Sequence, residues 1–323
     1  MNAFCTYFDT GYASRGLALL DSLWLHCQYS RVWVLCLDES VAEQLKLLVP
    51  PRNHQLHLLT LAEIETQYPE LLEAKQTRSR VEYIFTLSPV VPLHILDLED
   101  APSSITYLDA DLLFFASPDL AFAELEGASV GITPHRFPIG QEEKSVFGVF
   151  NVGFNFFRND AVSREVLQDW RQRCLSWCLD LLECDKFADQ KYLDTWPARW
   201  PNSVRIIHHP GINSAPWNLL RHPLRRAIDG TWWVGEQSLI CFHFHGFKQV
   251  KAGLYDLNTH NYGKHPDALL IELYSDYVRL LNAHGGIPIG YARQANWSPS
   301  TFLEKLRFWR YILNGRYPRL PKK

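Results

Sequence analysis

One segment of the chain indicates the fold most strongly: Ile105-Thr106-Tyr107-Leu108-Asp109-Ala110-Asp111-Leu112-Leu113-Phe114-Phe115. Two carboxylates, one residue apart, interrupt an apolar run where a charge is costly unless it is paired or metal-bound. Alternate residues of a strand point the same way, so Asp109 and Asp111 are expected to converge on one site. Their oxygens suit Mg²⁺ or Mn²⁺, which also bind diphosphate. A solvated turn capping the strand is the alternative interpretation.

The chain before this segment alternates between strand-like and helix-like patterns. Strands are expected over 3–8, 32–37 and 55–59, and helices over 14–27 and 40–49. Such alternation implies right-handed crossovers and a largely parallel sheet.

The remaining elements continue an α/β pattern and then become helical. The further strands are expected over 105–108, 112–115, 128–133, 151–157, 204–208 and 239–243. The further helices are expected over 160–182, 188–196, 267–284 and 299–313. We therefore expect one α/β domain over 1–265, followed by a helical C-terminal extension over 266–323.

Composition narrows the class of protein. The 323 residues are 47% hydrophobic and 13% aromatic, enough for a large core, and the net charge of −3 gives no global attraction to nucleic acid. The seven cysteines form no CxxC pair, which favours a reduced, cytoplasmic compartment. No signal peptide is recognised at the start, and no apolar stretch is long enough to span a membrane.

Tyr107-Leu108-Asp109-Ala110-Asp111 resembles the DxD motif of GT-A glycosyltransferases, notably the retaining family-8-type enzymes. The resemblance implies a mixed, mostly parallel Rossmann-like sheet flanked by helices, and a nucleotide-sugar donor, with uridine as the base. It also implies that Asp109 and Asp111 bind Mn²⁺ or Mg²⁺, and that Asp109 and Ala110 lie against the donor.

The beginning of the chain is similar to the nucleoside-binding opening of that family. It reads Thr6-Tyr7-Phe8-Asp9-Thr10-Gly11-Tyr12. By resemblance, Asp9 meets the base, Tyr12 stacks on it and Thr6 lies nearby, while Arg80 matches a basic residue near the donor. A core position for Tyr12 and a surface ion pair for Arg80 are the alternatives.

Two further motifs follow the DxD. Phe150-Asn151-Val152-Gly153-Phe154-Asn155 resembles the family strand whose first Asn touches the donor sugar, here Asn151. A structural hydrogen bond is the alternative, and it is the expected role of Asn155.

The second of these motifs, Phe187-Ala188-Asp189-Gln190-Lys191, resembles the family's Asp-Gln pair. It implies that Asp189 binds sugar hydroxyls and that Gln190 lies beneath the anomeric carbon. These two are the expected catalytic residues. A helix N-cap is the alternative role for Asp189.

The segment Cys241-Phe242-His243-Phe244-His245-Gly246-Phe247-Lys248 resembles the family's His-x-x-Gly motif. By resemblance His243 completes the metal site, with His245 as the alternative ligand because i and i+2 share a strand face. Lys248 is the candidate for the diphosphate, and Lys251 competes with it.

Two polar loops are candidates for the acceptor side of the site. His135 and Arg136 follow one expected strand, and Asn213 and Trp217 lie in a loop rich in Gly and Pro. The family resemblance covers about residues 3–250 and extends to a bacterial glycosyltransferase group.

Residues 301–323 combine apolar residues at helical spacing with many basic ones. The apolar residues are Phe302, Leu306, Trp309 and Leu313, and the basic ones are Lys305, Arg307, Arg310, Arg316, Arg319, Lys322 and Lys323. A basic amphipathic helix favours an anionic membrane surface. A helix packed on the catalytic domain is the alternative. Membrane contact fits a lipid-linked acceptor.

The expected function is therefore a metal-dependent, retaining glycosyltransferase acting on a glycan or lipid-linked glycan, as in bacterial polysaccharide biosynthesis. It is expected in the cytoplasm, with peripheral contact at the inner face of the membrane. A sugar-nucleotide nucleotidyltransferase would need a Gly-rich basic loop after the first strand, and Gly11–Gly16 carries only Arg15. A phosphohydrolase would need more acidic or histidine ligands near that strand than Asp9 alone. A non-catalytic carbohydrate-binding protein on the same fold is the third competing function.

Overall fold

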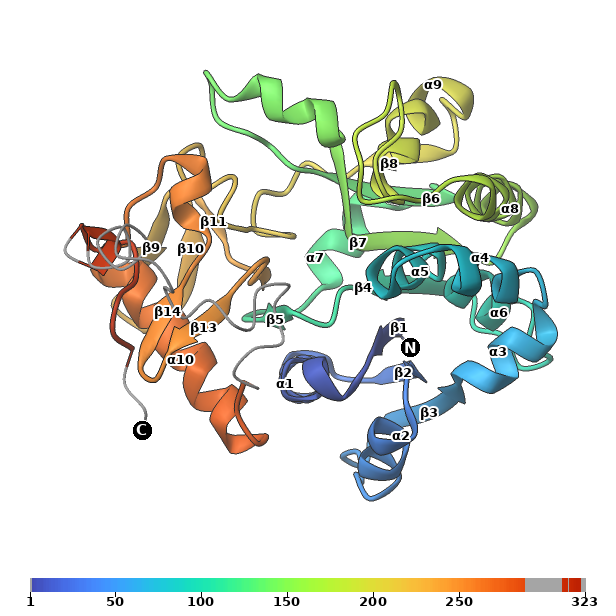
Figure 1. Ribbon diagram of the computed structural model, residues 1–323, viewed down its shortest axis with the longest axis horizontal. Coiled ribbons are helices and arrows are strands. Elements are labelled where there is room, and N and C mark those ends of the chain that lie inside the picture. The colour runs from blue at the N-terminus through green and yellow to red at the C-terminus, as the bar shows by residue number, and fades with distance from the viewer. Residues whose placement is uncertain (1, 288–309, 313, 321–323) are drawn as a thin grey trace.

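A seven-stranded sheet forms the centre of the computed structural model, which describes residues 2–287, 310–312 and 314–320. Its strands are β1 (Asn2–Phe8), β2 (Ser30–Cys36), β3 (His54–Thr60), β4 (Ser104–Leu108), β6 (Val130–Pro134), β7 (Phe150–Arg158) and β8 (Val204–Ile206). Their order is β3-β2-β1-β4-β7-β6-β8 (Figure 1). The β3–β2, β2–β1, β1–β4 and β6–β8 pairs are parallel. β7 runs antiparallel to both of its neighbours, β4 and β6. The predicted mixed, mostly parallel sheet is confirmed.

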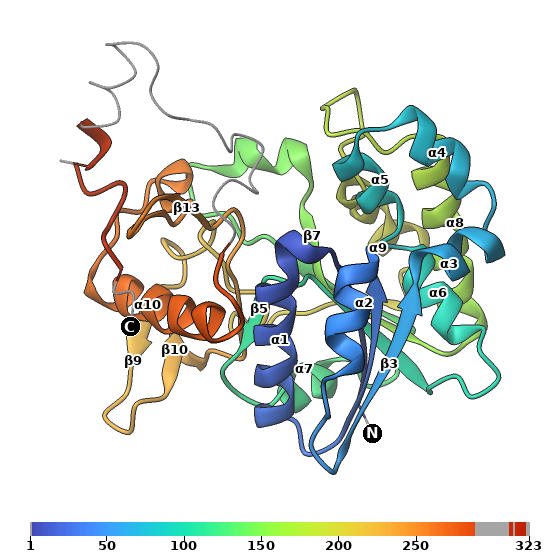
Figure 2. The same ribbon diagram turned by 60° about the horizontal axis from the view of Figure 1, so that its bottom comes forward.

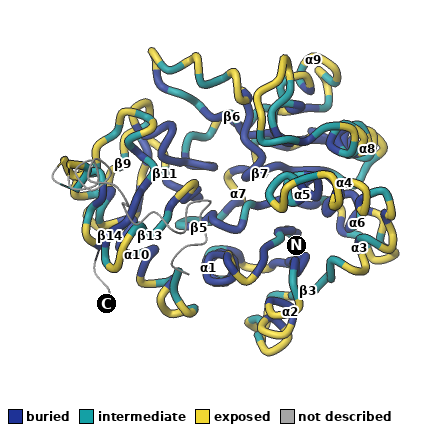
Figure 3. The backbone as a smooth tube through the Cα atoms, in the orientation of Figure 1, coloured by how far each residue is buried: buried dark blue, intermediate teal, exposed yellow. Residues whose placement is uncertain are grey.

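Alternation along the strands divides the core between the two faces of the sheet. In β1, Ala3 and Cys5 belong to one apolar cluster, while Phe4 and Phe8 belong to the other. The helices α1 (Ala13–His26) and α2 (Glu39–Lys46) pack on the Phe4 side (Figure 2). The helices α6 (Val90–Leu96) and α8 (Ala161–Ser176) cover the Cys5 side. Figure 3 shows these central strands buried along most of their length.

Several short helices complete the fold. They are α3 (Leu61–Gln67), α4 (Leu71–Thr77), α5 (Arg80–Thr86), α7 (Asp119–Glu124), α9 (Trp196–Arg199), and the 3-10 turns η1 (Thr10–Tyr12), η2 (Glu142–Phe147), η3 (Gln190–Thr195) and η4 (Thr259–Tyr262). The helices between residues 61 and 96 are absent from our sequence expectations. The helix expected over 188–196 is instead η3 followed by α9. Ala188, with φ of 46°, cannot continue a right-handed helix.

The apolar run 105–115 forms the two expected strands, but they belong to different sheets. β4 ends at Leu108, and β5 (Leu112–Phe114) pairs antiparallel with β12 (Cys241–His243). Between β4 and β5 the amide of Leu112 donates to the carbonyl of Asp109 at 3.1 Å, which closes a turn. The two carboxylates are therefore brought together by a turn, and the expected strand alternation at this point was wrong.

A second, smaller layer packs beside β5 and β12. It contains β9 (Leu224–Arg226), β10 (Trp232–Val234), β11 (Gln237–Ser238), the hairpin of β13 (Lys248–Lys251) and β14 (Leu254–Asp256), and α10 (Ala268–Ala283). Phe242, Phe244 and Phe247 share one core with Tyr274 and Tyr277 of α10. α10 thus packs on the layer that carries β12, and the division expected at residue 265 stays a prediction.

The end of the chain is described only in part. Apart from residues 310–312, which are helical, the helix expected over 299–313 lies outside the described residues, as does most of the basic tail. No helix in the described part of the chain combines the length and the apolar character needed to cross a membrane.

Candidate active site

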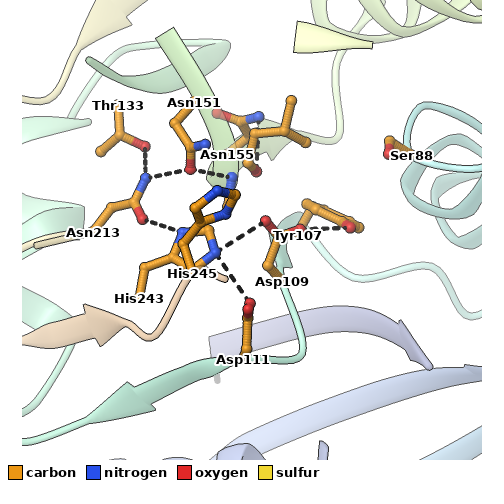
Figure 4. Close-up of polar contacts among 12 residues, drawn as sticks. Ser88, Tyr107, Asp109, Asp111, Thr133, Asn151, Asn155, Asn213, His243 and His245 are labelled. Atoms are coloured by element: carbon orange, nitrogen blue, oxygen red, sulfur yellow. Dashed lines mark hydrogen bonds and ion pairs between the residues drawn. The ribbon is translucent and has the colours of Figure 1, made fainter. Parts of the chain in front are cut away.

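Asp109, Asp111 and His243 meet where the central sheet adjoins the smaller layer (Figure 4). His243 Nε2 lies 3.0 Å from Asp111 Oδ1 and 3.6 Å from Asp109 Oδ2. One ligand atom from each residue lies within 4.8 Å of the others, and within the described ranges no other group of His, Cys, Asp and Glu meets this test. The turn after β4 supplies both carboxylates, and the end of β12 supplies the imidazole.

The charges of this cluster are strongly coupled. Burial raises the pKa of Asp109 by more than the neighbouring His243 lowers it. Burial would also raise the pKa of Asp111, but His243 overrides that effect and brings it to about 2. Burial would lower the pKa of His243, yet the charge and hydrogen bond of Asp111 raise it above its ordinary value. A positive charge is thus favoured between the carboxylates, which a proton or a divalent cation can supply.

The donor set fits a divalent cation. Two carboxylates and one imidazole nitrogen are ligands that Mn²⁺ and Mg²⁺ sites use. Two of the candidate ligands, Asp109 and His243, are also hydrogen-bonded to a neighbouring side chain. The Tyr107 hydroxyl donates to Asp109 Oδ1 at 2.9 Å, and His243 Nδ1 lies 3.0 Å from Asn213 Oδ1. Such outer hydrogen bonds orient metal ligands.

Asp189 is a buried carboxylate with its own hydrogen-bond network. Its Oδ2 accepts from the Ser88 hydroxyl at 2.6 Å, and Ser88 also contacts the Tyr7 hydroxyl at 2.8 Å. Burial raises the pKa of Asp189 to about 7, with the Asp109 charge adding to the effect. Asp189 stands at the N-cap position of η3, as in the expected alternative, but its side chain makes no cap hydrogen bond to that helix.

Gln190 is the first residue of η3 and is half-buried. Its Nε2 donates to the carbonyl of Phe147 at 2.8 Å, which ties η3 to the η2 segment.

The expected nucleoside-binding residues gather at the end of β1. Asp9 accepts from the Tyr12 amide at 3.2 Å and forms an ion pair with Arg80 at 2.8 Å. The Tyr12 ring is 38% exposed, with the Arg15 guanidinium 4.5 Å from its centre, so it is not a core residue. Thr6 is buried in β1, and its hydroxyl has no hydrogen-bond partner among the described residues.

The two asparagines of β7 differ in their surroundings. Asn151 Oδ1 accepts from the Gly153 amide at 2.9 Å and from Asn213 Nδ2 at 2.8 Å. Asn155 is fully buried and donates to the Val152 carbonyl at 3.2 Å, as a structural residue would.

The other residues of the His-x-x-Gly segment lie around the cluster. The His245 ring is 5.5 Å from that of His243, but it lies beyond the end of β12 and is not one of the three grouped ligands. Lys248 begins β13, opposite Asp256 of β14. Ala110 is buried between the two carboxylates.

The four expected acceptor residues lie behind the cluster and are buried or nearly so. Asn213 and Trp217 are 0% and 2% exposed. The ring centres of Trp217 and His135 lie 5.1 Å apart in a T-shaped arrangement, and the Arg136 guanidinium donates to three backbone carbonyls of the 207–212 segment. Asn213 and Trp217 contact His243 directly, and an acceptor role for these four residues stays a prediction.

Sequence reasoning missed several residues of the site. Ser88, Tyr107 and Gly153 contact expected site residues, yet only Tyr107 and Gly153 lie inside a recognised motif. Gly153 carries a signal that could have been used, because a glycine inside a buried strand often marks close approach of another group.

Two Bacillus subtilis proteins are similar in sequence. The uncharacterized protein YfnD is 30% identical over 282 residues, which cover 85% of this chain and 87% of YfnD. The uncharacterized protein YfnF is 32% identical over 257 residues, which cover 77% and 82% of the two chains. No protein-family model matches the sequence.

Solved glycosyltransferases have a similar fold. Galactosyltransferase LgtC, in complex with donor and acceptor sugar analogs, has a TM-score of 0.52 at 14% identity, over 87% of this chain and 95% of LgtC. Glycosyltransferase GlyE of Streptococcus pneumoniae has a TM-score of 0.53 at 14% identity, over 100% of this chain and 65% of GlyE. At these identities the likeness shows the fold, and it confirms the expected GT-A architecture.

Proposed function

The chain belongs to the protein family that includes YfnD and YfnF of Bacillus subtilis, and we propose that it is a metal-dependent glycosyltransferase that takes its sugar from a nucleotide donor. The observation that carries this proposal is the Asp109–Asp111–His243 cluster on a GT-A fold. A cation held there would neutralise charge on the diphosphate of the donor.

The residues around the cluster support the binding of such a donor. Asp9, Arg80 and the half-exposed Tyr12 ring would hold the nucleoside, for which we propose uridine. Lys248 would add positive charge near the diphosphate. Asp189 and Asn151 would bind hydroxyls of the sugar, and Gln190 would lie beneath its anomeric carbon.

The reaction we propose retains the anomeric configuration. The bond between the anomeric carbon and the diphosphate oxygen breaks, and an acceptor hydroxyl bonds to that carbon from the same face. The leaving diphosphate takes the proton of that hydroxyl. Gln190 carries an amide rather than a carboxylate, so it is a poor covalent nucleophile, which favours this direct route over a glycosyl-enzyme intermediate. A product with the inverted configuration would contradict it.

The acceptor we propose is a glycan or a lipid-linked glycan, in bacterial polysaccharide assembly on the cytoplasmic side of the membrane. The basic residues Arg310, Arg316 and Arg319 near the end of the chain would favour an anionic surface. Co-sedimentation with anionic but not neutral vesicles would test this part separately.

Donor turnover tests the proposal. The protein would be incubated with Mn²⁺ and a panel of UDP- and GDP-sugars, and release of the nucleoside diphosphate would be followed. We expect release from one donor, lost without Mn²⁺ and in Asp111→Asn, and kept in Asp185→Asn, which alters an exposed carboxylate. Failure of a folded protein to bind or cleave any donor would favour the non-catalytic carbohydrate-binding alternative.

A further inference from the structure

The second ring nitrogen of His243 lies in a buried chain of amide hydrogen bonds (Figure 4). The chain begins at the backbone amide of Gly153, which can only donate, and which bonds to Asn151 Oδ1 at 2.9 Å. Asn151 must therefore present its oxygen, and the atom of Asn213 that lies 2.8 Å from that oxygen must be the donating Nδ2.

The orientation of the Asn213 amide then decides which ring nitrogen of neutral His243 carries the hydrogen. With Nδ2 turned to Asn151, Oδ1 of Asn213 faces His243 Nδ1 at 3.0 Å. A carbonyl oxygen only accepts, so Nδ1 must carry the hydrogen and Nε2 is left with its lone pair. That lone pair is directed toward Asp109 and Asp111, at 3.6 and 3.0 Å.

The backbone around this chain is built to hold it. Asn213 is fully buried with φ of 55°, a left-handed conformation that asparagine tolerates better than most residues. A Cβ atom on Gly153 would lie 2.7 Å from Asn151 Oδ1 and 2.8 Å from His243 Nδ1, so no larger residue fits there without a shift. Arg136 fixes the segment before Asn213 through the carbonyls at 207, 209 and 212.

We propose that Gly153, Asn151 and Asn213 are positioning residues that hold His243 with Nδ1 protonated and Nε2 free to bind the metal. This inference rests on the metal dependence of the proposed function. The inference also restricts how Asn151 can contact a sugar, because its Oδ1 already accepts two hydrogen bonds. Its Nδ2 has no hydrogen-bond partner among the described residues and is the atom left to donate to a sugar hydroxyl.

The test replaces Asn213 by glycine, which is at ease at positive φ and removes the whole side chain, including the amide. Mn²⁺ binding would be measured by electron paramagnetic resonance, without donor. We expect Asn213→Gly to bind Mn²⁺ about 10- to 100-fold more weakly than the wild type, the usual effect of losing an outer hydrogen bond. Cys184→Gly is the matched control, because Cys184 is also left-handed, with φ of 49°, but is exposed. Affinity equal to the wild type in Asn213→Gly would overturn the proposal.

A spectroscopic readout separates positioning from general damage. In metal-free protein at a pH above the titration of His243, ¹⁵N spectra of the ring, assigned with His243→Gln, should show the hydrogen on Nδ1. Asn151→Asp keeps an acceptor for Gly153 and Asn213, so it should keep this tautomer, whereas Asn151→Leu should lose it. The same tautomer in all variants, or a hydrogen on Nε2 in the wild type, would refute the inference.

These measurements also distinguish the two proposals. Wild-type protein with the Nδ1 tautomer but no Mn²⁺ binding would contradict the proposed function and leave the amide chain intact. Mn²⁺ binding that does not change when Asn213 is replaced would contradict the role of the amide chain and leave the proposed function intact.

Discussion

Replacing Asp189 by asparagine should stabilise the metal-free protein at alkaline pH. Burial raises the pKa of Asp189 to about 7, against about 3.9 in an unfolded chain. Between these values the folded state binds the proton and the unfolded state does not, so stability falls as pH rises. This contribution is greatest below about pH 3.9 and is lost as pH rises to about 7.

The size of the effect follows from the two pKa values. Above both of them, ionisation of Asp189 costs the folded protein about 4 kcal/mol. Asparagine is neutral at every pH, and its Oδ1 can still accept from Ser88, so the variant avoids this cost. Between about pH 5.5 and about pH 8.5, its advantage over the wild type should grow by about 2 kcal/mol.

The assay is urea denaturation of both proteins at each pH, in the presence of a chelator. The quantity to follow is the difference in the free energy of unfolding between variant and wild type, because other titrating groups cancel in it. Asp185→Asn, at an exposed site nearby, serves as the control and should show no such trend. A difference for Asp189→Asn that does not change with pH would refute the reasoning, since it would mean that the buried carboxyl titrates normally.

Three further outcomes are expected around the metal cluster. Tyr107→Phe removes the hydroxyl 2.9 Å from Asp109 Oδ1. Mn²⁺ binding should then weaken about tenfold, with an unchanged circular dichroism spectrum. Unchanged Mn²⁺ affinity would contradict an orienting role for Tyr107. Gly153→Ala should lower the free energy of unfolding, measured by urea denaturation, by about 1–3 kcal/mol through overpacking against Asn151 and His243. An unchanged free energy of unfolding would show that the His243 ring has room to move. Because Asp111 raises the pKa of His243 against the effect of burial, a proton competes with the metal, so Mn²⁺ affinity should fall about tenfold per pH unit below that pKa; a flat titration would exclude His243 as a ligand.

Much of the α/β layer follows from local sequence patterns. A short apolar run in residues 3–8 and helical spacing in 14–27 predict β1 and α1, because a buried central strand is apolar on both faces and a helix repeats every 3.6 residues. Two acidic residues in an apolar run likewise predict a charged site. Short helices such as α3 and α5 escape this reasoning, because seven residues make only about two helical turns, fewer than a periodicity pattern needs.

The sequence by itself determined the alternation of strands and helices over residues 3–60 and the acidic pair, and the family resemblance pointed to its histidine partner. Only the tertiary structure decided what surrounds them. β5 leaves the main sheet to pair with β12, and Asn213 meets Asn151 and His243 from 62 and 30 residues away. Nothing local to a loop asparagine specifies such partners, because a buried amide takes whichever donor and acceptor the packed chain brings to it. For the same physical reason, loop residues that look like an acceptor surface in the sequence lie behind the metal cluster in the fold.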